Sequence, residues 1–346
     1  MNIDELKKSI QAHFTDGLVT IVGSGLSAGY SLPTMGQLAQ HLLNEVPKKF
    51  DITTCGHWKA IDERLNDQVG IEVALRDLAA DNPLIPVITD LVADLIEQKE
   101  LEVITSALSG DIRLAFRDLV PHLTFSNDRH FVITTNYDRL IELSIEQANV
   151  AIGTLFDGKV FGRLDKKACR SSMNIAVAAK TKVGVQLVSR KHVVVLKPHG
   201  SLDWYEGKEH PVRCPIKLPL RRLMIAPGGQ KYRKGYESPF DIHRADANEA
   251  IDKATRYLVI GYGFNDDHLE THLRAEIGKG KPCLVLVRGL TDNIKDLLSK
   301  NKSLTVLSHA EEETVPGTLL SQNGVHSFFA GINLWSLDSF IKEVLT

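Results

Sequence analysis

Five short apolar segments, each followed by small or polar residues and then by a helical pattern, constrain the fold most. Their continuous Val, Ile and Leu content is typical of parallel strands that are covered on both faces. The segments are 18–23, 130–136, 192–198, 256–264 and 282–289. Helical patterns occur at 2–14, 35–46, 138–148, 240–254, 267–278, 291–300 and 335–345. This alternation predicts an α/β fold with a Rossmann-like, doubly wound parallel sheet.

Two interruptions of this alternation predict inserted modules within a single domain spanning 1–346. A mainly helical insertion is expected at about 51–127, and mixed, basic insertions are expected at about 151–191 and 206–239. The core would then comprise about 1–50, 128–150, 192–205 and 240–346. The segment from Lys208 to Lys234 has eight basic residues and one acid, Glu209. A solvated polar insertion is the favoured interpretation, and a surface for a partner or a phosphate is the alternative.

Composition excludes several classes of function. The net charge of −2 gives no reason to expect direct nucleic-acid binding. No apolar run reaches 18 residues, and the N-terminus has an amphipathic pattern with acidic residues, so we expect a cytoplasmic protein without a membrane span or signal peptide. The cysteines are too scattered for a disulfide framework or a four-cysteine zinc site: Cys55, Cys169, Cys214 and Cys283. His268 and His272 have metal-like spacing but no third ligand nearby, so a partly exposed helix face is expected instead.

A glycine-rich loop follows the first predicted strand. Gly23, Gly25 and Ala28 fit a relaxed GxGxxA pattern between a strand and a helix. Small residues there let backbone N–H groups approach a pyrophosphate near a helix N-terminus, although plain strand–helix connections also have such turns. A dehydrogenase would place an acidic residue after a second strand about 20 residues on. The corresponding segment, QHLLNEVPKKFD, is helical and then basic, which disfavours a standard dehydrogenase.

Three more strand ends carry polar or small residues. Asn136 and Asp138 follow the second strand, although Asp138 could simply cap the next helix. His199 follows the third strand, where it is either a site residue or a buried structural histidine. Gly261 ends the fourth strand and permits close approach of a ribose or phosphate. Because parallel strands present their carboxyl ends at one edge, we expect these residues to converge on one site.

The ordered motifs GSGLS, TTNYD, PHGS and VIGYGF resemble the sirtuin-like fold. More closely, they resemble the divergent sirtuin-like NAD-cleaving domains of bacterial anti-phage defence systems. Protein-deacylating sirtuins carry paired CxxC motifs for zinc, which this chain lacks. They also follow the loop proline with Asp-Phe-Arg, whereas here Pro33 precedes Thr34-Met35-Gly36. Both departures count against an acyl-lysine deacylase.

The resemblance implies a role for each matched residue. Asn136 and His199 would be catalytic, with Asp138 beside the nicotinamide and its ribose. The remaining residues would bind NAD+, with Arg288 expected near the adenosine end: Gly23, Ser24, Gly25, Ser27, Ser201, Gly261 and Arg288. NAD+ would be the substrate, and no metal is expected.

These inferences predict an NAD+ hydrolase that releases nicotinamide and ADP-ribose and depletes NAD+ during anti-phage defence. An NAD-dependent deacylase or ADP-ribosyltransferase is one alternative, and a non-catalytic module that senses NAD or ADP-ribose is another. Stand-alone domains of this size resemble those paired with a HerA-type hexameric ATPase. A homo-oligomer with such a partner is therefore expected.

Overall fold

A nine-stranded sheet forms the centre of the computed structural model, which describes residues 2–49, 56–79, 81–178, 185–228, 237–265 and 267–346. The strand order is β16-β15-β14-β13-β12-β1-β2-β8-β3. From β14 to β3 all neighbours are parallel, whereas β15 and β16 are antiparallel. The strands are β1 (Leu18–Val22), β2 (Arg129–Thr134), β3 (Ala151–Gly153), β8 (His192–Leu196), β12 (Arg256–Ile260), β13 (Cys283–Val287), β14 (Leu304–Glu312), β15 (Val315–Gln322) and β16 (Val325–Ala330).

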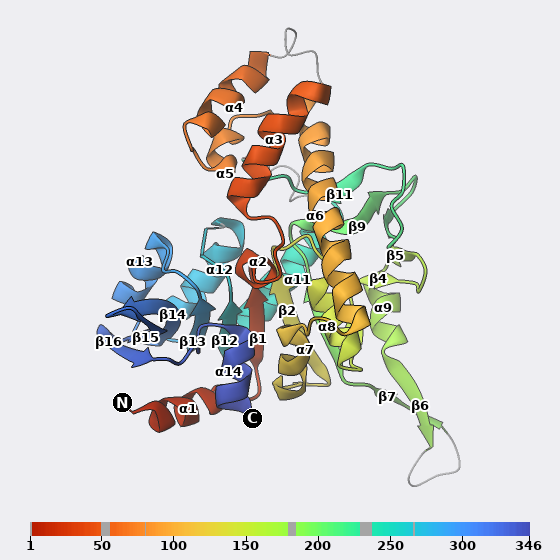
Figure 1. The fold of residues 1–346 in the computed structure, drawn as a ribbon. Coiled ribbons are helices and arrows are strands. Elements are labelled where there is room, and N and C mark those ends of the chain that lie inside the picture. Colours follow the sequence, from red (N-terminus) through yellow and green to blue (C-terminus); the bar gives the residue numbers. More distant parts are fainter. Residues whose placement is uncertain (1, 50–55, 80, 179–184, 229–236, 266) are drawn as a thin grey trace.

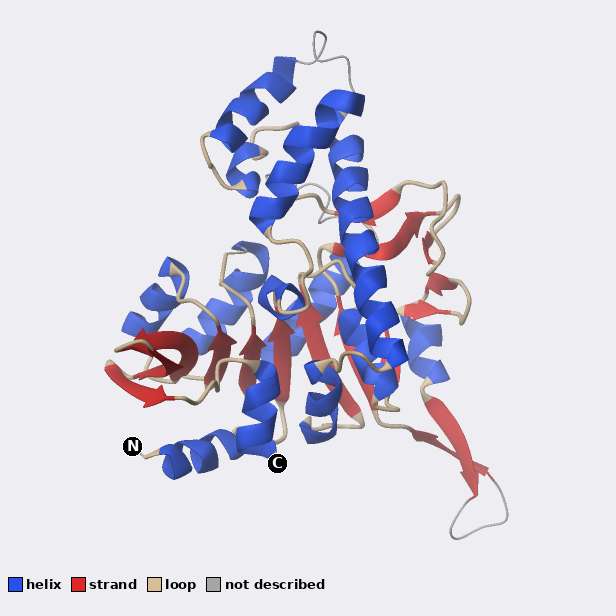
Figure 2. Ribbon diagram, in the orientation of Figure 1, coloured by secondary structure: helices blue, strands red, loops and turns tan. Residues whose placement is uncertain are grey.

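Helices cover both faces of this sheet, as Figures 1 and 2 show. On one face pack α1 (Ile3–Gln11), α7 (Ala115–Leu119), α8 (Leu140–Gln147), α14 (Leu337–Phe340) and the final turn Ile341–Leu345. On the other pack α11 (Phe240–Lys253), α12 (Asp267–Gly278) and α13 (Asp292–Lys300). Along β12, Leu258 belongs to the first apolar cluster, and Tyr257 and Val259 belong to the second. Because successive side chains alternate between faces, an unbroken apolar strand fills both clusters. The doubly wound fold expected from the sequence is confirmed.

A helical module with its own apolar core stands beyond one edge of the sheet (Figure 1). Its helices are α3 (Met35–Lys49), α4 (Gly56–Asn66), α5 (Ile71–Ala74) and α6 (Leu84–Ser109). Leu42 of α3, Trp58 of α4 and Ile88 of α6 share this core. The expected boundary near residue 50 therefore separates α3 from the helices on which it packs. Conversely, α7 and the 3₁₀ turn Val120–His122 lie within the expected helical insertion but pack on the sheet.

Strands from the two mixed insertions, together with β9 from the expected core segment 192–205, build a second, five-stranded sheet, and the first insertion also forms a projecting hairpin. The sheet contains β4 (Phe156–Asp157), β5 (Gly162–Leu164), β9 (Gly200–Glu206), β10 (Pro211–Arg213) and β11 (Arg222–Met224). Helix α9 (Lys166–Ser172) leads to the hairpin of β6 (Asn174–Ala178) and β7 (Val185–Ser189). Short polar strands such as these were not individually predicted, because no long apolar run marks them.

The basic stretch from Lys208 to Lys234 is partly neutralised by acids from other elements. Arg213 binds Asp203 at 2.7 Å, and Arg222 binds Glu97 of α6 at 2.7 Å. Two further ion pairs join Lys217 to Asp94 at 2.7 Å and Arg221 to Glu206 at 2.5 Å. These four cations therefore fasten the second sheet internally and to α6. Lys231, Arg233 and Lys234 fall outside the described residues.

Among the described residues, no helix is long and apolar enough to cross a membrane. Nor do three His, Cys, Asp or Glu side chains gather there as a metal site would require. His272 Nδ1 lies 2.9 Å from Asp252 Oδ1 and is partly exposed. Cys169, Cys214 and Cys283 are buried free thiols, whereas Cys55 lies outside the described part of the chain.

Candidate active site

A cavity of about 390 Å³ lies at the carboxyl ends of the parallel strands. The chain adds β2 and β8 on one side of β1, and it adds β12, β13 and β14 on the other side. Open α/β sheets bind ligands at such a switch point, which here lies between β1 and β12. Six of the predicted site residues line this cavity: Ser24, Ser27, Asn136, Asp138, His199 and Gly261. The convergence expected from four separate strand ends is therefore present in the fold.

Asn136 is fixed by its amide nitrogen while its amide oxygen stays available. Nδ2 donates to Gly23 O at 3.0 Å and to Ser27 Oγ at 2.9 Å. The residue is only 6% exposed, and Oδ1 is buried without a hydrogen-bond partner among the described residues. Leaving a buried acceptor unsatisfied costs about 1–3 kcal/mol. Such an orphan on a cavity wall is what a binding site for a hydroxyl, a water or an N–H donor requires.

Asp138 is a buried carboxyl that spans two structural tasks. Oδ2 accepts from Ser27 Oγ at 2.7 Å, and Oδ1 accepts from Leu140 N at 3.2 Å at the start of α8. Asp138 is not the N-cap residue suggested by the simpler interpretation, because that position is held by Arg139 without a side-chain cap bond. Asp138 instead accepts from the first helical N–H, and the same side chain also lines the cavity. Burial raises the pKa of Asp138, although Lys197 and the hydrogen bond from Ser27 oppose that rise.

His199 reaches the cavity through a tight turn between β8 and β9. Gly200 N donates to Lys197 O at 3.0 Å, and Ile225 N donates to His199 O at 3.0 Å. Gly200 has a φ of +88°, and a Cβ there would stand 2.2 Å from Leu223 O. Only glycine both adopts this positive φ readily and lacks the Cβ that would clash with Leu223 O. The HGS triplet therefore holds His199 on the cavity wall, where 6% of it is exposed.

A buried ion pair between Lys197 and Glu142 stabilises the loop that follows β2. Lys197 Nζ lies 3.0 Å from Glu142 Oε1 and also donates to Asp138 O at 2.5 Å and Tyr137 O at 3.4 Å. Lys197 is 2% exposed and Glu142 is 6% exposed. Because Lys197 donates to backbone carbonyl groups between Asn136 and α8, it stabilises the loop that carries the side chains of Asn136 and Asp138.

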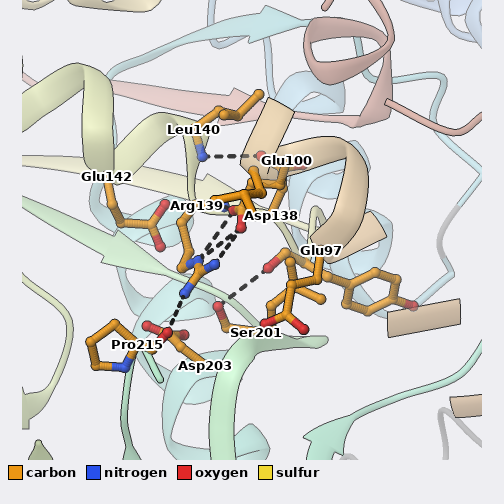
Figure 3. A network of polar contacts seen from close by, with 12 residues as sticks. Glu97, Glu100, Asp138, Arg139, Leu140, Glu142, Ser201, Asp203 and Pro215 are labelled. Atoms are coloured by element: carbon orange, nitrogen blue, oxygen red, sulfur yellow. Dashed lines mark hydrogen bonds and ion pairs between the residues drawn. The ribbon is translucent and has the colours of Figure 1, made fainter. Parts of the chain in front are cut away.

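A second polar network joins the same loop to the helical module (Figure 3). Arg139 forms an ion pair with Glu100 of α6, and its backbone N–H also donates to that carboxylate. Glu100 is completely buried. The guanidinium reaches Pro215 O at 3.4 Å, next to the second sheet. Three parts of the molecule therefore meet beside Asp138.

The glycines of the first loop have a packing role that the sequence did not reveal. Gly25 N donates to Gly261 O at 2.9 Å, so this N–H is already used within the protein. A Cβ on Gly23 would lie 2.6 Å from Gly261 O, and a Cβ on Gly25 would lie 2.7 Å from Gly261 Cα. Gly261 itself has a φ of +61°. The loops after β1 and β12 approach each other by backbone, while Ser24 and Ser27 of α2 (Ser24–Ala28) face the cavity.

Four of the ten predicted site residues are outside the cavity lining: Gly23 and Gly25, which pack against Gly261, and Ser201 and Arg288. Ser201 is fully buried in β9, where its Oγ donates to Tyr137 O at 3.3 Å. Arg288 follows β13 and is exposed. The lining also contains residues that sequence reasoning did not single out: Leu32, Leu38, Gly70, Ile71, Glu72, Val73, Ile96, Thr135, Tyr262 and Gly263. Those from α5 and its flank belong to the helical module, and no local signal indicated that they would cover the sheet edge.

Comparison with known families identifies the domain. The family model described as a SIR2-like domain matches residues 130–306, just over half of the chain. This protein belongs to the SIR2-like domain family. The matched region contains β8, β12 and all of β2 except Arg129, and it includes Asn136, Asp138, His199 and Gly261. No curated protein matches the chain.

Solved sirtuin structures are similar to this SIR2-like protein at low identity. A Sir2 variant with a deacetylated p53 peptide and 3'-O-acetyl ADP-ribose is 11% identical, with 100% of this chain and 98% of that chain covered and a TM-score of 0.43. A structure on the basis of sirtuin substrate affinity is 14% identical, with 84% and 90% covered and a TM-score of 0.38. The assignment of the site therefore depends on the geometry of this chain itself.

Proposed function

We propose that this SIR2-like protein is an NAD+ glycohydrolase that cleaves the nicotinamide–ribose bond. The observation that carries the proposal is the unsatisfied Oδ1 of Asn136 on the wall of the same cavity as His199. A pure binding module needs no general base, whereas a histidine held at a cavity wall suits one. The cavity also lies at the switch point where nucleotides bind in doubly wound folds.

The chemistry makes modest demands on the protein. Nicotinamide leaves NAD+ as a neutral molecule with the electrons of the C–N bond, and an oxocarbenium-like ribose remains. Water then forms the new C–O bond, and its proton is released, giving ADP-ribose. Orientation of the substrate and stabilisation of the developing positive charge are therefore the main requirements.

The side chains at the cavity can meet these requirements. Asn136 Oδ1 would accept a hydrogen bond from the attacking water or a ribose hydroxyl, held in place by the two bonds of Nδ2. His199 would act as the base, since the unprotonated nitrogen of a neutral imidazole can accept a proton from the attacking water or a ribose hydroxyl. Asp138, locked by Ser27, would position the nicotinamide end.

We further propose that the enzyme depletes NAD+ as an effector of anti-phage defence, as a homo-oligomer with a HerA-type ATPase partner. The support is the ordered motif set of residues 19–289, which resembles the defence domains more than the zinc-containing deacylases. Such an activity requires control, which assembly with a partner would supply.

The decisive assay incubates the purified protein with NAD+, with and without an acetylated peptide, and identifies the products. We expect nicotinamide and ADP-ribose regardless of peptide. Products containing the acyl group or ADP-ribosylated peptide would instead establish a transferase or deacylase. Binding without turnover would establish a sensing module.

Two variants test the assigned roles. His199→Ala should lower turnover by about 10²–10⁴-fold, the usual contribution of acid–base catalysis. Asn136→Ala should lower it by about 10²–10³-fold, the usual cost of removing one hydrogen-bonding group that acts in the transition state. The matched controls are Asn66→Ala on α4 and His210→Ala, both of which are exposed and outside the cavity. Unchanged melting temperatures would show that the variants remain folded. Full activity of Asn136→Ala would refute the assignment.

A further inference from the structure

A second cavity, of about 510 Å³, lies at the opposite edge of the main sheet. It is bounded by the beginnings of β1, β2 and β8 and by helices α9 and α11. The six-residue strand β2 separates Arg129 at this edge from the Asn136 loop, which corresponds to about 20 Å at 3.3 Å per residue. None of the residues assigned to NAD+ lines it. The proposed hydrolase therefore leaves this cavity without a role.

The inner wall of the second cavity is apolar. Val19, Phe131 and Val194 come from three adjacent strands, and Leu155 and Met173 close the sides. A volume of this size falls within the range that small-molecule sites occupy, and such sites are mostly apolar with a few placed polar groups. The wall would accommodate a flat or compact apolar body.

The charged groups around the cavity do not balance. Four cations line it, and two acids accompany them. Lys166 is paired with Asp246 at 2.5 Å, and Lys253 is paired with Glu249. Within the described residues, the guanidinium groups of Arg129 and Arg170 have neither a hydrogen bond nor an ion pair, and only the backbones of these residues are hydrogen-bonded. Both acids are thus engaged by lysines, and the two guanidinium groups are left unmatched.

Arg129 is held in a position suited to receive an anion. Its guanidinium lies 5.7 Å from the centre of the Phe131 ring, so it stacks against the apolar wall. Burial lowers the pKa of Arg129, and the nearby charge of Arg170 lowers it further, although Glu249 opposes this. An anion between the two arginines would relieve their repulsion. Guanidinium groups bind phosphate and carboxylate in bidentate geometry.

We propose that this second cavity binds a small organic anion. Its phosphate or carboxylate head would lie between Arg129 and Arg170, and its apolar body would lie on the wall formed by Phe131 and its neighbours. Both parts are needed, because the arginines alone would attract any anion and the wall alone would not orient one.

The test uses 1-naphthyl phosphate as a probe in titration calorimetry with the full chain. We expect binding that the Arg129→Gln/Arg170→Gln double variant weakens by at least about tenfold, since one charge-assisted hydrogen bond is worth that much. The control Arg117→Gln/Arg163→Gln removes the same charge from two exposed arginines outside the cavity and should bind normally. 1-Naphthoate distinguishes a carboxylate ligand from a phosphate ester.

Several results would overturn the proposal. These are the absence of binding, equal binding by the Arg129/Arg170 variant, and loss of binding in His199→Ala, which would place the probe in the other cavity. Equal affinity for inorganic phosphate, which has no apolar body, would show that the apolar wall contributes nothing. Equal affinity for neutral 1-naphthol, which has no charge, would show that the arginines contribute nothing. Melting temperatures of both double variants show whether either is unfolded. A failure here leaves the hydrolase proposal unaffected, because NAD+ turnover is measured separately.

Discussion

The buried pair of Lys197 and Glu142 supports a quantitative prediction about the loop that presents the site. Lys197→Met removes the cation but leaves a carboxylate that is 6% exposed. Oε2 of that carboxylate already has no partner among the described residues, and Lys197 is the cation that forms an ion pair with Oε1 there. Breaking a buried pair by removing one partner costs about 3–5 kcal/mol. We expect the free energy of unfolding to fall by that amount.

The double variant Lys197→Met/Glu142→Leu should recover part of this loss, because the uncompensated carboxylate of Glu142 is removed, while buried Asp138 still lacks its nearby cation. Recovery should fall short by about 1–2 kcal/mol, since Asp138 O loses the donor that now lies 2.5 Å away. Tyr137 O is less affected because Leu202 N also donates to it, at 3.1 Å.

Urea unfolding measures both variants, followed by circular dichroism and by tryptophan fluorescence, whose coincidence tests two-state behaviour. Lys342→Met, which removes a lysine from an exposed pair with Asp338, is the control and should change stability by less than about 1 kcal/mol. The reasoning fails if Lys197→Met costs no more than this control. It also fails if the double variant is less stable than Lys197→Met alone.

Two further predictions concern the strand-end glycines and the buried histidines. Gly261→Ala should lower the free energy of unfolding by at least about 2 kcal/mol in urea titrations, because its φ is +61° and a Cβ would lie 2.4 Å from Leu26 N. The control Gly36→Ala should not lower it, because a Cβ at Gly36 meets nothing within 4 Å. Equal effects of the two substitutions would contradict the packing argument. Burial lowers the pKa of His243 to about 3 and that of His130 to about 4. Both values lie below 6.5, so the unfolded chain binds protons first and stability should fall as pH decreases from about 6.5 to 4. At pH 5 His243 alone should account for about 2 kcal/mol, and His243→Leu should flatten the measured profile; an unchanged slope would refute this.

The sequence indicated the main sheet because its strands bury both faces. Tyr257 and Val259 face one layer while Leu258 faces the other, so an unbroken apolar run was visible without coordinates. Strand β9 was missed because buried Ser201 and Asp203 interrupt its apolar pattern. Strands β14 to β16 alternate with polar residues along an antiparallel edge and were also missed.

The site was predictable only to the extent that strand ends fix positions. Asn136, Asp138 and His199 meet because parallel strands bring their carboxyl ends together. The engagement of Gly25 by Gly261 and the arrival of Ile71 from the helical module depend on tertiary packing. No periodicity or spacing encodes such contacts. The family relation adds residue identities to this picture, but the orientation of each side chain comes from the folded chain.

The interlocked loops after β1 and β12 also bear on how this domain can diverge. Each of Gly25 and Gly261 occupies the space that a side chain on the other would need. Neither position can accept a larger residue while the other loop stays in place, and a change at one gives no room at the other. We therefore expect Gly25 and Gly261 to be conserved together across homologous sequences, or to be lost together along with the geometry of the cavity. An alignment in which one glycine varies freely while the other stays fixed would show that the loops tolerate separation.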